Sequence, residues 1–433
     1  MDPRVVFRFL GGLVLIIGVT GAENDSDVGV ATGRRLNFNP FTNFNNFNNF
    51  NNFNNNLNNN NWISPQQARY ADCTTQLGAG GLCMRSKECG RSGGIPSGFC
   101  SGLNVCCLVA LQCGGASSAK KIIINNNVAT TTTGSSTCAY TINRFSPYVC
   151  QLRVDFSTNM PMPTSTSTDG TLMPSCTGTY LQINNIQFCG VNNNQHVYVP
   201  FAPPTSSYQI TAAVSSTATS GSVSANWQVT ITQLECPPSN STSLYTSTNL
   251  YDNTNLNTNL FTTQYPGQIL DFRKLLKKRN FDTDLIAPNG CLQYFPAPSG
   301  TFESFNYNGG LGPYMPNMQY AICFNRLPTS TGIQFYGQTF SMSYNEGLQY
   351  DDDCFDPITP SASNDFLLIP YSTITQTMTS ATRYCGKILD KQNLVANPPG
   401  PFVVLVNTGV RYRSDATNPT TERAFRIDYS VIG

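Results

Sequence analysis

Apolar and polar residues alternate with a period of two in several stretches of the chain. In CQLRVDF (residues 150–156), every second residue from Cys150 to Phe156 is apolar and the residues between them are polar. The stretches NWQVTITQLEC (226–236) and RAFRIDYSVIG (423–433) repeat the pattern with larger apolar side chains. A period of two is typical of a half-buried strand in an antiparallel sheet. The chain is therefore predicted to be mainly β.

The cysteine spacing shows an internal repeat. Cys113 and Cys291 are 178 residues apart, and so are Cys176 and Cys354. A further cysteine precedes glycine in each block, as Cys189-Gly190 and as Cys385-Gly386, and each block ends in an alternating strand. Two copies of one β-sandwich explain these matches, so we expect one domain at 113–236 and a second at 290–433.

Two segments lack the period of a helix or of a strand. Within 23–72, phenylalanine recurs every third residue from Phe44 to Phe53 among asparagines, with no charge to interrupt it. Such a tract buries too little surface to offset chain entropy, so we predict disorder. It acts either as a spacer, which we favour, or as a self-associating segment. Residues 237–289 are predicted to be a polar linker whose basic run, Arg273–Arg279, is either solvated, as we favour, a processing site or a heparin contact.

The first residues predict secretion. Arg4 and Arg8 precede an apolar run, and small residues follow as far as Ala22, which is the pattern of a signal peptide at 1–22. The alternative is a membrane anchor, but the run is much shorter than the roughly 20 residues a helix needs to span a bilayer. Asn24 and Asn240 begin glycosylation sequons.

Composition narrows the function classes. Only 11% of the residues are charged and the net charge is +1, so nucleic-acid binding is not expected. The chain has 16 cysteines, an even number that fits disulfides in an oxidising compartment.

Residues 73–107 hold six of these cysteines, including the adjacent pair Cys106 and Cys107. A segment of this size relies on cross-links rather than on a core. Neighbouring cysteines are too close for an unstrained bridge, so each is expected to have its own partner. Spacing alone does not choose among the pairings, and a zinc site is the less favoured alternative.

Both repeats resemble CUB domains, which are extracellular β-sandwiches. The first opens with CGG at 113–115, and CTGTYLQI (176–183) stands where the family has a C-x-x-D-x-V-x-I strand. The second opens with GTFESFNY (300–307), similar to the family's G-x-I-x-S-P-N-Y, and continues with NDFLLIP, YCGKI and FVVLVNTG. The resemblance implies two CUB-like jelly-roll sandwiches.

The 73–107 segment is similar to the clip module of arthropod protease cascades, with a shorter gap between Cys89 and Cys100 than is usual. The whole arrangement is closest to an arthropod group of secreted CUB proteins. These resemblances imply a pairing for fourteen cysteines, and Cys150 and Cys236 remain as a further pair. The implied disulfides are Cys73–Cys106, Cys83–Cys100, Cys89–Cys107, Cys113–Cys138, Cys150–Cys236, Cys176–Cys189, Cys291–Cys323 and Cys354–Cys385.

No catalytic residues are expected. The single histidine, His196, lies in an alternating stretch without a nucleophile motif such as G-x-S-x-G, and it is interpreted as a surface or strand-edge residue. With every cysteine in a disulfide, no thiol nucleophile remains.

One subset of CUB domains binds calcium, which needs six to eight oxygen ligands. The first repeat has Thr179 at the family's aspartate position, so we expect no calcium there. The second has Asp365 at that position, with Asp353 and Asp356 upstream, but Gly409 stands where a later aspartate belongs. These three aspartates are the candidate site, weak or vestigial; a solvated acidic loop is the favoured alternative, and no other cofactor is expected.

Together these features predict a secreted, non-enzymatic protein that binds extracellular proteins or glycans through CUB-like domains, with no nucleic-acid partner and no membrane span. Two alternatives remain. A regulator of an extracellular serine-protease cascade is suggested by the clip-like module, and a matrix or cuticle component by the Asn/Phe-rich tract.

Overall fold

The structure is a computed structural model of the chain. It describes residues 71–75, 80–100, 102–125, 136–160, 175–176, 178–214, 226–237, 281–343, 348–355, 364–409 and 424–433. Several predicted features lie outside these residues, namely the signal peptide (1–22), the Asn/Phe-rich tract, both sequons, the basic run 273–279 and Asp356. Among the described residues, no helix has the length and apolar character needed to cross a membrane.

A small disulfide-rich module comes first. Its four strands pair in the order β1-β2-β4-β3, and one short helix packs against them. Cys106 and Cys107 are neighbours on β4, and their bridges lead to Cys73 and Cys89 respectively. The adjacent cysteines thus hold two different parts of the module. The elements are β1 (Asp72–Thr74), β2 (Gly80–Arg85), α1 (Ser86–Arg91), β3 (Ile95–Phe99) and β4 (Asn104–Leu108).

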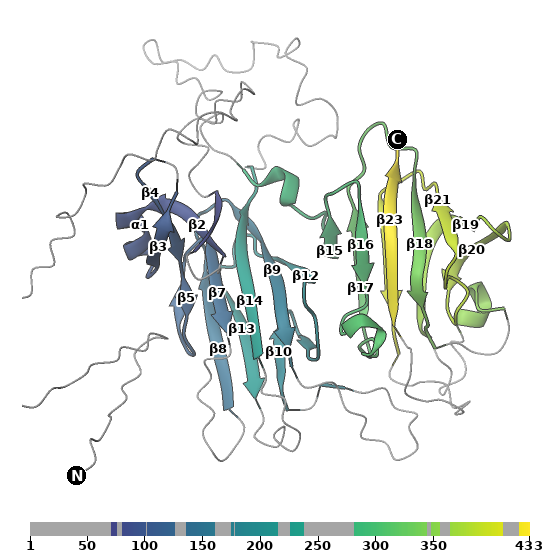
Figure 1. Ribbon diagram of the computed structural model, residues 1–433, viewed down its shortest axis with the longest axis horizontal. Helices are drawn as coiled ribbons and strands as arrows, with labels where there is room; N and C mark the ends of the chain where they lie inside the picture. Colours follow the sequence, from purple (N-terminus) through teal and green to yellow (C-terminus); the bar gives the residue numbers. More distant parts are fainter. Residues whose placement is uncertain are drawn as a thin grey trace, which may run out of the picture. The chain divides into compact units, whose positions relative to one another are not determined.

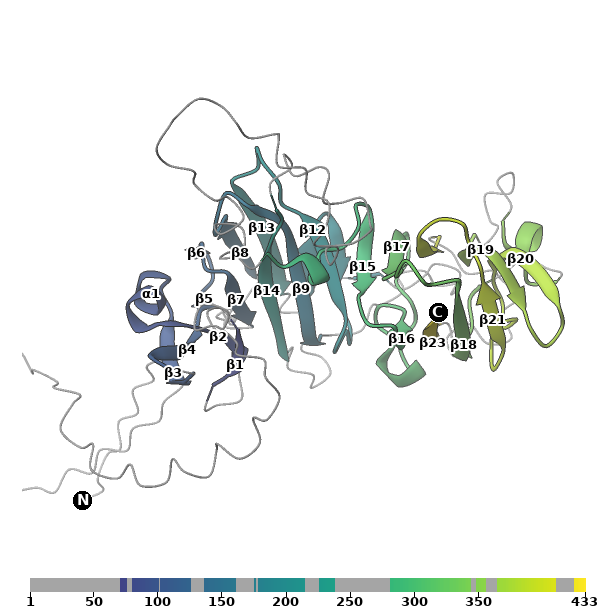
Figure 2. The same ribbon diagram turned by 90° about the horizontal axis from the view of Figure 1, so that it is seen from above.

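The first sandwich consists of two five-stranded sheets, in the orders β11-β10-β13-β8-β6 and β12-β9-β14-β7-β5. Figures 1 and 2 show the two sheets stacked, with β13 and β8 in one layer and β14 and β9 in the other. The strands are β5 (Ala110–Leu111), β6 (Ala116–Ser117), β7 (Lys121–Asn125), β8 (Ser136–Asn143), β9 (Val149–Asn159), β10 (Tyr180–Ile183), β11 (Ile186–Phe188), β12 (His196–Pro200), β13 (Ser207–Val214) and β14 (Asn226–Glu235).

The second sandwich is a nine-stranded sheet that folds over at β19. The first part of β19 pairs with β22 and the last part with β21, so the strand belongs to both layers. The order is β15-β17-β22-β19-β21-β18-β23-β16, with β20 beside β19. The strands are β15 (Cys291–Phe295), β16 (Ser299–Glu303), β17 (Gln319–Phe324), β18 (Gly332–Phe340), β19 (Phe366–Ile374), β20 (Thr379–Tyr384), β21 (Asn393–Ala396), β22 (Phe402–Asn407) and β23 (Phe425–Ile432).

The two sandwiches share one topology. The order β6-β8-β13-β10-β11 corresponds to β15-β17-β22-β19-β20, and each begins with a parallel pair. The order β7-β14-β9-β12 likewise corresponds to β16-β23-β18-β21. The alternating apolar residues form the cores, as Trp227, Phe425 and Ile427 show at 1%, 0% and 1% exposure. The predicted fold class, mainly β with two sandwiches after a disulfide-rich module, is confirmed.

The eight disulfides in the structure join the pairs that the family resemblances and the remaining Cys150 and Cys236 implied. In each sandwich one bridge lies beside the parallel strand pair and another flanks the hairpin at the opposite end of the same sheet. Cys150–Cys236 has no counterpart among the second sandwich's described residues and joins β9 to the end of β14.

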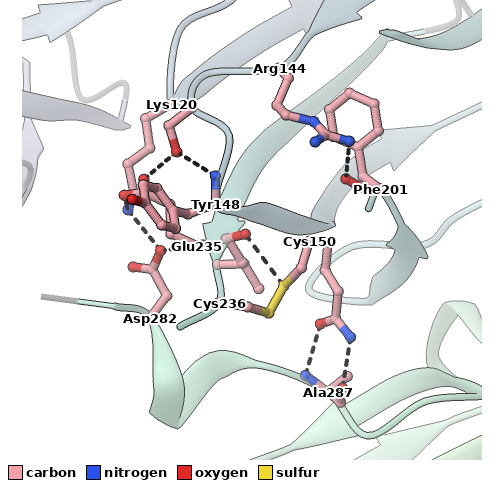
Figure 3. Close-up of a disulfide and its surroundings, with 12 residues drawn as sticks. Lys120, Arg144, Tyr148, Cys150, Phe201, Glu235, Cys236, Asp282 and Ala287 are labelled. Atoms are coloured by element: carbon pink, nitrogen blue, oxygen red, sulfur yellow. Dashed lines mark hydrogen bonds and ion pairs between the residues drawn. A yellow bond between two sulfur atoms is a disulfide. The ribbon is translucent and has the colours of Figure 1, made fainter. Parts of the chain in front are cut away.

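The expected linker 237–289 is wrong in its last part, because residues 281–289 pack on the first sandwich. Asp282 accepts hydrogen bonds from the Lys120 ammonium at 2.7 Å and from the backbone N–H of Glu235 at 2.8 Å. Close by, the Gln151 amide bonds both backbone atoms of Ala287, at 2.7 and 3.0 Å (Figure 3). The first sandwich also begins before residue 113, since β5 pairs with β7.

The described residues, all within one unit at 63–433, include a polar seam between the sandwiches. Asn306 donates its backbone N–H to the Asn192 side chain at 2.8 Å, and its own Oδ1 accepts the N–H of Val191 at 3.1 Å. The Gln195 amide donates to the carbonyl of Ser304 at 2.9 Å. The Phe188 and Phe305 rings meet edge to face beside these bonds. Side chains thus satisfy backbone groups that no strand pairs.

Candidate functional site

Four residues line up across the outer face of the second sandwich. Arg383 on β20 lies opposite Leu368 on β19, Leu368 opposite Leu405 on β22, and Leu405 opposite Ala321 on β17. Val403 lies on the same side of β22 as Leu405, and Phe366 on the same side of β19 as Leu368, because side chains alternate along a strand. We call these six residues, together with Phe355, the outer strip.

The outer strip is apolar although it faces away from the core. The inward neighbours Leu367 and Val404 are fully buried, as a sandwich core requires. Leu405 nevertheless remains 41% exposed and Phe355 39% exposed. Leu368 is half-buried beside the Cys354–Cys385 bridge. Ala321 and Val403 are half-buried against an apolar cluster that includes Tyr198 and Leu234 of the first sandwich. The open face of an antiparallel sheet is ordinarily polar. Apolar side chains on such a face contribute no free energy of burial to the fold while they remain exposed. This marks the exposed part of the strip, Leu405 and Phe355, as a contact surface.

A guanidinium group closes one end of the strip. The Arg383 guanidinium lies 5.2 Å from the ring centre of Phe355 and 5.6 Å from that of Phe366, which is cation–π distance. Asp351 accepts hydrogen bonds from the backbone N–H groups of Thr382 and Arg383 and so holds this part of β20 in place. The Nε of Arg383 is buried and has no hydrogen-bond partner among the described residues. The strip therefore offers apolar contact area and, at one end, a guanidinium group held beside two aromatic rings.

The Cys354–Cys385 bridge fixes the ends of two segments that carry the strip. Both sulfurs are buried in a small apolar cluster with Phe366 and Leu368. Phe355 follows Cys354 directly, and Arg383 precedes Cys385 by two residues. The bridge thus places the aromatic ring and the guanidinium on the same side of the sheet.

Asp365 and Asp353, the two candidate calcium residues that the structure describes, are not brought together as a site. Asp365 is fully buried, and its carboxylate accepts hydrogen bonds from the Tyr314 hydroxyl and from the Gly409 N–H, the latter at 2.6 Å. Asp353 instead accepts the N–H of Leu348. Among the described residues, the only group of three or more metal-ligating side chains comprises Cys73, Cys83 and Cys100, which are disulfide-bonded.

The donors around Asp365 explain this result. Gly409 stands at the position of the family's later aspartate, and its N–H donates to the Asp365 carboxylate. An aspartate at this position would instead place a second carboxylate there, and the two acids would need a cation between them. The Tyr314 hydroxyl satisfies the other oxygen and also accepts the N–H of Ser343 at 2.9 Å. Within the described part of the chain, two protein donors bond the Asp365 carboxylate, and Asp365 belongs to no group of three or more side chains that could hold a cation.

His196 is not a surface residue, contrary to one of the two interpretations of the sequence. It begins β12, an edge strand, and only 5% of it is exposed because it faces β15 in the seam. Burial and the nearby Arg153 lower its pKa to about 4. Its ring contacts the aromatic rings of Tyr198 and Phe295 and the backbone of Tyr294. These surroundings hold a neutral, packed imidazole.

The strip was missed at the sequence level, although a signal was present. The stretches FVVLV (402–406) and FLLI (366–369) are apolar without alternation. In an antiparallel sheet, continuous apolar residues imply that both faces are apolar. The runs therefore carried the information that the outer face of this sheet is unusual.

Comparison with known proteins identifies the second sandwich. Residues 288–432 match the family described as "Animal CUB domain". No curated protein sequence matches the chain.

Two similar solved structures contain CUB domains by their titles. The CUB1-EGF-CUB2 domains of rat MASP-1 are 12% identical, and the match covers 73% of this chain and 99% of that one at a TM-score of 0.20. The CUB1-EGF-CUB2 domain of human MASP-1/3 is also 12% identical, with 72% and 100% covered and a TM-score of 0.19. On the family match, this protein contains a CUB domain, formed by residues 288–432.

Proposed function

We propose that the protein is a secreted, non-enzymatic binding protein that captures extracellular proteins through the outer strip of its CUB domain. The observation that carries this proposal is the apolar row on the outer sheet face, in which Leu405 is 41% exposed between the half-buried Leu368 and Ala321 and which ends at Arg383. Phe355 and Arg383 are of residue types that are enriched at protein interfaces, and the leucines beside them add apolar contact area.

The chemistry of the strip defines the partner. A protein segment that places apolar side chains over Leu405 and a carboxylate beside the half-buried Arg383 would complement both the apolar row and the positive charge at its end. Burying Leu405 and Phe355 would add hydrophobic contact area, which is worth about 25 cal/mol per Å² before the costs of association. The preformed sheet and the Cys354–Cys385 bridge keep those costs low.

The first sandwich is proposed to be a second CUB-like domain, because its strand order repeats that of the CUB domain. Secretion is proposed from the leader at 1–22, and the disulfides and the CUB domain are typical of extracellular proteins. Amino-terminal sequencing of the secreted protein tests cleavage after Ala22. Mass spectrometry before and after glycosidase treatment tests glycans at Asn24 and Asn240.

Affinity capture tests the proposed function. The immobilised full chain is incubated in extracellular fluid of the source organism, and retained proteins are identified by mass spectrometry. Leu405→Asp places a charge in the strip and is expected to reduce the specific partner about tenfold. Leu311→Asp is the matched control, because Leu311 is 81% exposed but lies outside the strip. Equal capture by both variants contradicts the proposal.

The cascade regulator stays as a second candidate because of one feature of the small module. Its β3–β4 hairpin exposes Phe99 by 88% and Leu103 by 95% beside the Cys83–Cys100 bridge. The clip-like identity of the module and its arthropod grouping belong to this second proposal. It predicts a stable complex with a trypsin-like zymogen that is lost in Phe99→Ser. If the immobilised chain retained only further copies of itself, and if deleting residues 36–62 of the Asn/Phe-rich tract abolished this, the result would instead support the matrix component.

A further inference from the structure

The first sandwich carries a polar cleft on the sheet face that corresponds to the outer strip. The cleft has a volume of about 390 Å³, within the range of small-molecule sites. It lies over β10 and β13 and the hairpin turn between β10 and β11. Its lining residues are Gln182, Asn184, Asn185, Tyr208, Gln209 and Thr211.

The same positions of the two sandwiches carry opposite chemistry. In the first, Gln187 lies opposite Gln182, Gln182 opposite Thr211, and Thr211 opposite Ala139. The corresponding row of the CUB domain runs from Arg383 through two leucines to Ala321. One shared sheet face is therefore polar in the first sandwich and apolar in the second.

The polar face carries no charge. The five strands of this sheet, β11, β10, β13, β8 and β6, contain no Asp, Glu, Lys, Arg or His. Arg144 follows β8, but its guanidinium is bonded to the carbonyl oxygens of Phe201 and Thr205. An ionic ligand would form no ion pair with this sheet, whereas a neutral ligand needs none for its binding affinity.

Four side chains of the cleft keep their hydrogen-bonding groups available within the described part of the chain. The side chains of Gln182, Asn185, Gln209 and Thr211 make no hydrogen bond to any described residue. Each amide offers two donors and a carbonyl acceptor, and the threonine hydroxyl both donates and accepts. Neighbouring hydroxyl groups on a ligand also donate and accept, so paired amides match them.

The cleft is preorganised. Asn184 and Asn185 both have positive φ, 50° and 64°, as a tight hairpin turn requires. The Tyr208 hydroxyl accepts the N–H of Asn184 at 2.5 Å and ties this turn to β13. The Cys176–Cys189 bridge closes the chain around the hairpin. Tyr208 is thus a positioning residue, and a ligand would not have to order the loop.

We infer that this cleft is a binding site for a neutral oligosaccharide. Free amides and a hydroxyl, a rigid turn and the lack of charge on the sheet favour a polyhydroxylated, uncharged ligand over an anionic glycan. A second protein is less well matched, since the face lacks the apolar anchors of the outer strip. The inference goes beyond protein capture, because it concerns another sandwich and another ligand class.

Calorimetric titration of the full secreted chain tests the inference. The probes are chitotetraose, mannotetraose, cellotetraose and lactose, with a heparin fragment as the anionic comparison. At least one neutral probe is expected to bind with equal affinity at about 0.05 M and about 0.5 M NaCl, because no ion pair forms. Binding of none of the neutral probes, or salt-sensitive binding of heparin in the cleft, overturns the inference.

Substitutions of cleft residues test whether the sugar binds in this cleft. Gln209→Ala and Thr211→Val are expected to weaken binding of the neutral probe about tenfold each. Gln228→Ala is the matched control, because Gln228 is a half-buried glutamine on β14 of the opposite sheet. Unchanged affinity in Gln209→Ala and Thr211→Val excludes the cleft. Leu405→Asp is expected to bind the sugar normally, so failure of sugar binding and failure of protein capture are distinguishable.

Discussion

The Nε2 atom of His196 lies 2.9 Å from the carbonyl oxygen of Tyr294 and 3.2 Å from its backbone nitrogen, at the seam between the sandwiches. The neutral ring makes one of these bonds according to its tautomer. The groups facing it are Arg153, Asp155, Tyr198 and Tyr294, and burial together with Arg153 outweighs the opposing effect of Asp155. The folded protein therefore resists protonation of this ring.

We predict that the free energy of unfolding falls as the pH drops from about 6.5 toward 4. Unfolded histidine has a pKa near 6.5, whereas the pKa of folded His196 is about 4. Between these values the unfolded chain binds a proton that the folded chain does not, so acid favours unfolding. The slope reaches about 1.4 kcal/mol per pH unit, for a total of about 3 kcal/mol.

Denaturant unfolding at several pH values between about 5 and 7 measures this slope. His196→Gln is the control, because it removes the only histidine of the chain while keeping hydrogen-bonding groups. The variant is expected to lose most of the slope in this range. An equal slope in both proteins would assign the acid sensitivity to other groups.

Gly190 and Asn306 allow a second prediction. Gly190 has φ +70°, and a Cβ atom there would lie 1.9 Å from Oδ1 of Asn306. Gly190→Ala therefore combines backbone strain with a clash in the seam and should destabilise the protein by about 3 kcal/mol. Gly114→Ala separates the two effects, because Gly114 has φ +74° with open space around it. That control should cost about 1 kcal/mol, and equal losses of melting temperature would refute the role of Asn306.

The strands were predictable because their alternation is local. Leu152, Val154 and Phe156 are buried as expected, and the same holds for Trp227 and Val229. Gln151 was placed on the open face by its position, yet it is only 8% exposed, because its amide bonds the backbone of Ala287. A period of two records which face points to the sandwich's own core. It does not show which distant segment of the chain packs on the other face of the strand.

The candidate sites were less predictable for the same reason. Motif positions suggested Asp365, but the sequence does not state which donors the carboxylate meets, and Tyr314 is 51 residues away along the chain. The outer strip and the polar cleft depend on pairing across three or four strands. That register is fixed by the whole sandwich, so residues such as Gln182 and Thr211 become neighbours only after folding.

Lys120 leads to a third prediction, about the packed end of the expected linker. Its side chain is 7% exposed and lies 2.7 Å from Asp282 and 3.4 Å from Glu235. Lys120→Met leaves two carboxylates without their cation and should destabilise the protein by about 3 kcal/mol. Limited proteolysis should then cut within residues 281–289 sooner than in the wild type. Lys121→Met is the control, because its partner Asp72 is 79% exposed, and it should change stability by less than about 1 kcal/mol.

The surroundings of Asp365 give the last prediction. Because the Tyr314 hydroxyl and the Gly409 N–H already satisfy its carboxylate, calcium should not raise the melting temperature relative to EDTA. Asp365→Ala removes the acceptor that the buried Tyr314 hydroxyl and the half-buried Gly409 N–H share, and it should cost about 2 kcal/mol or more, equally with calcium and with EDTA. Differential scanning calorimetry in both buffers measures the two effects. If calcium stabilised the wild type but not Asp365→Ala, then Asp365 would be a calcium ligand and its protein donors would be insufficient.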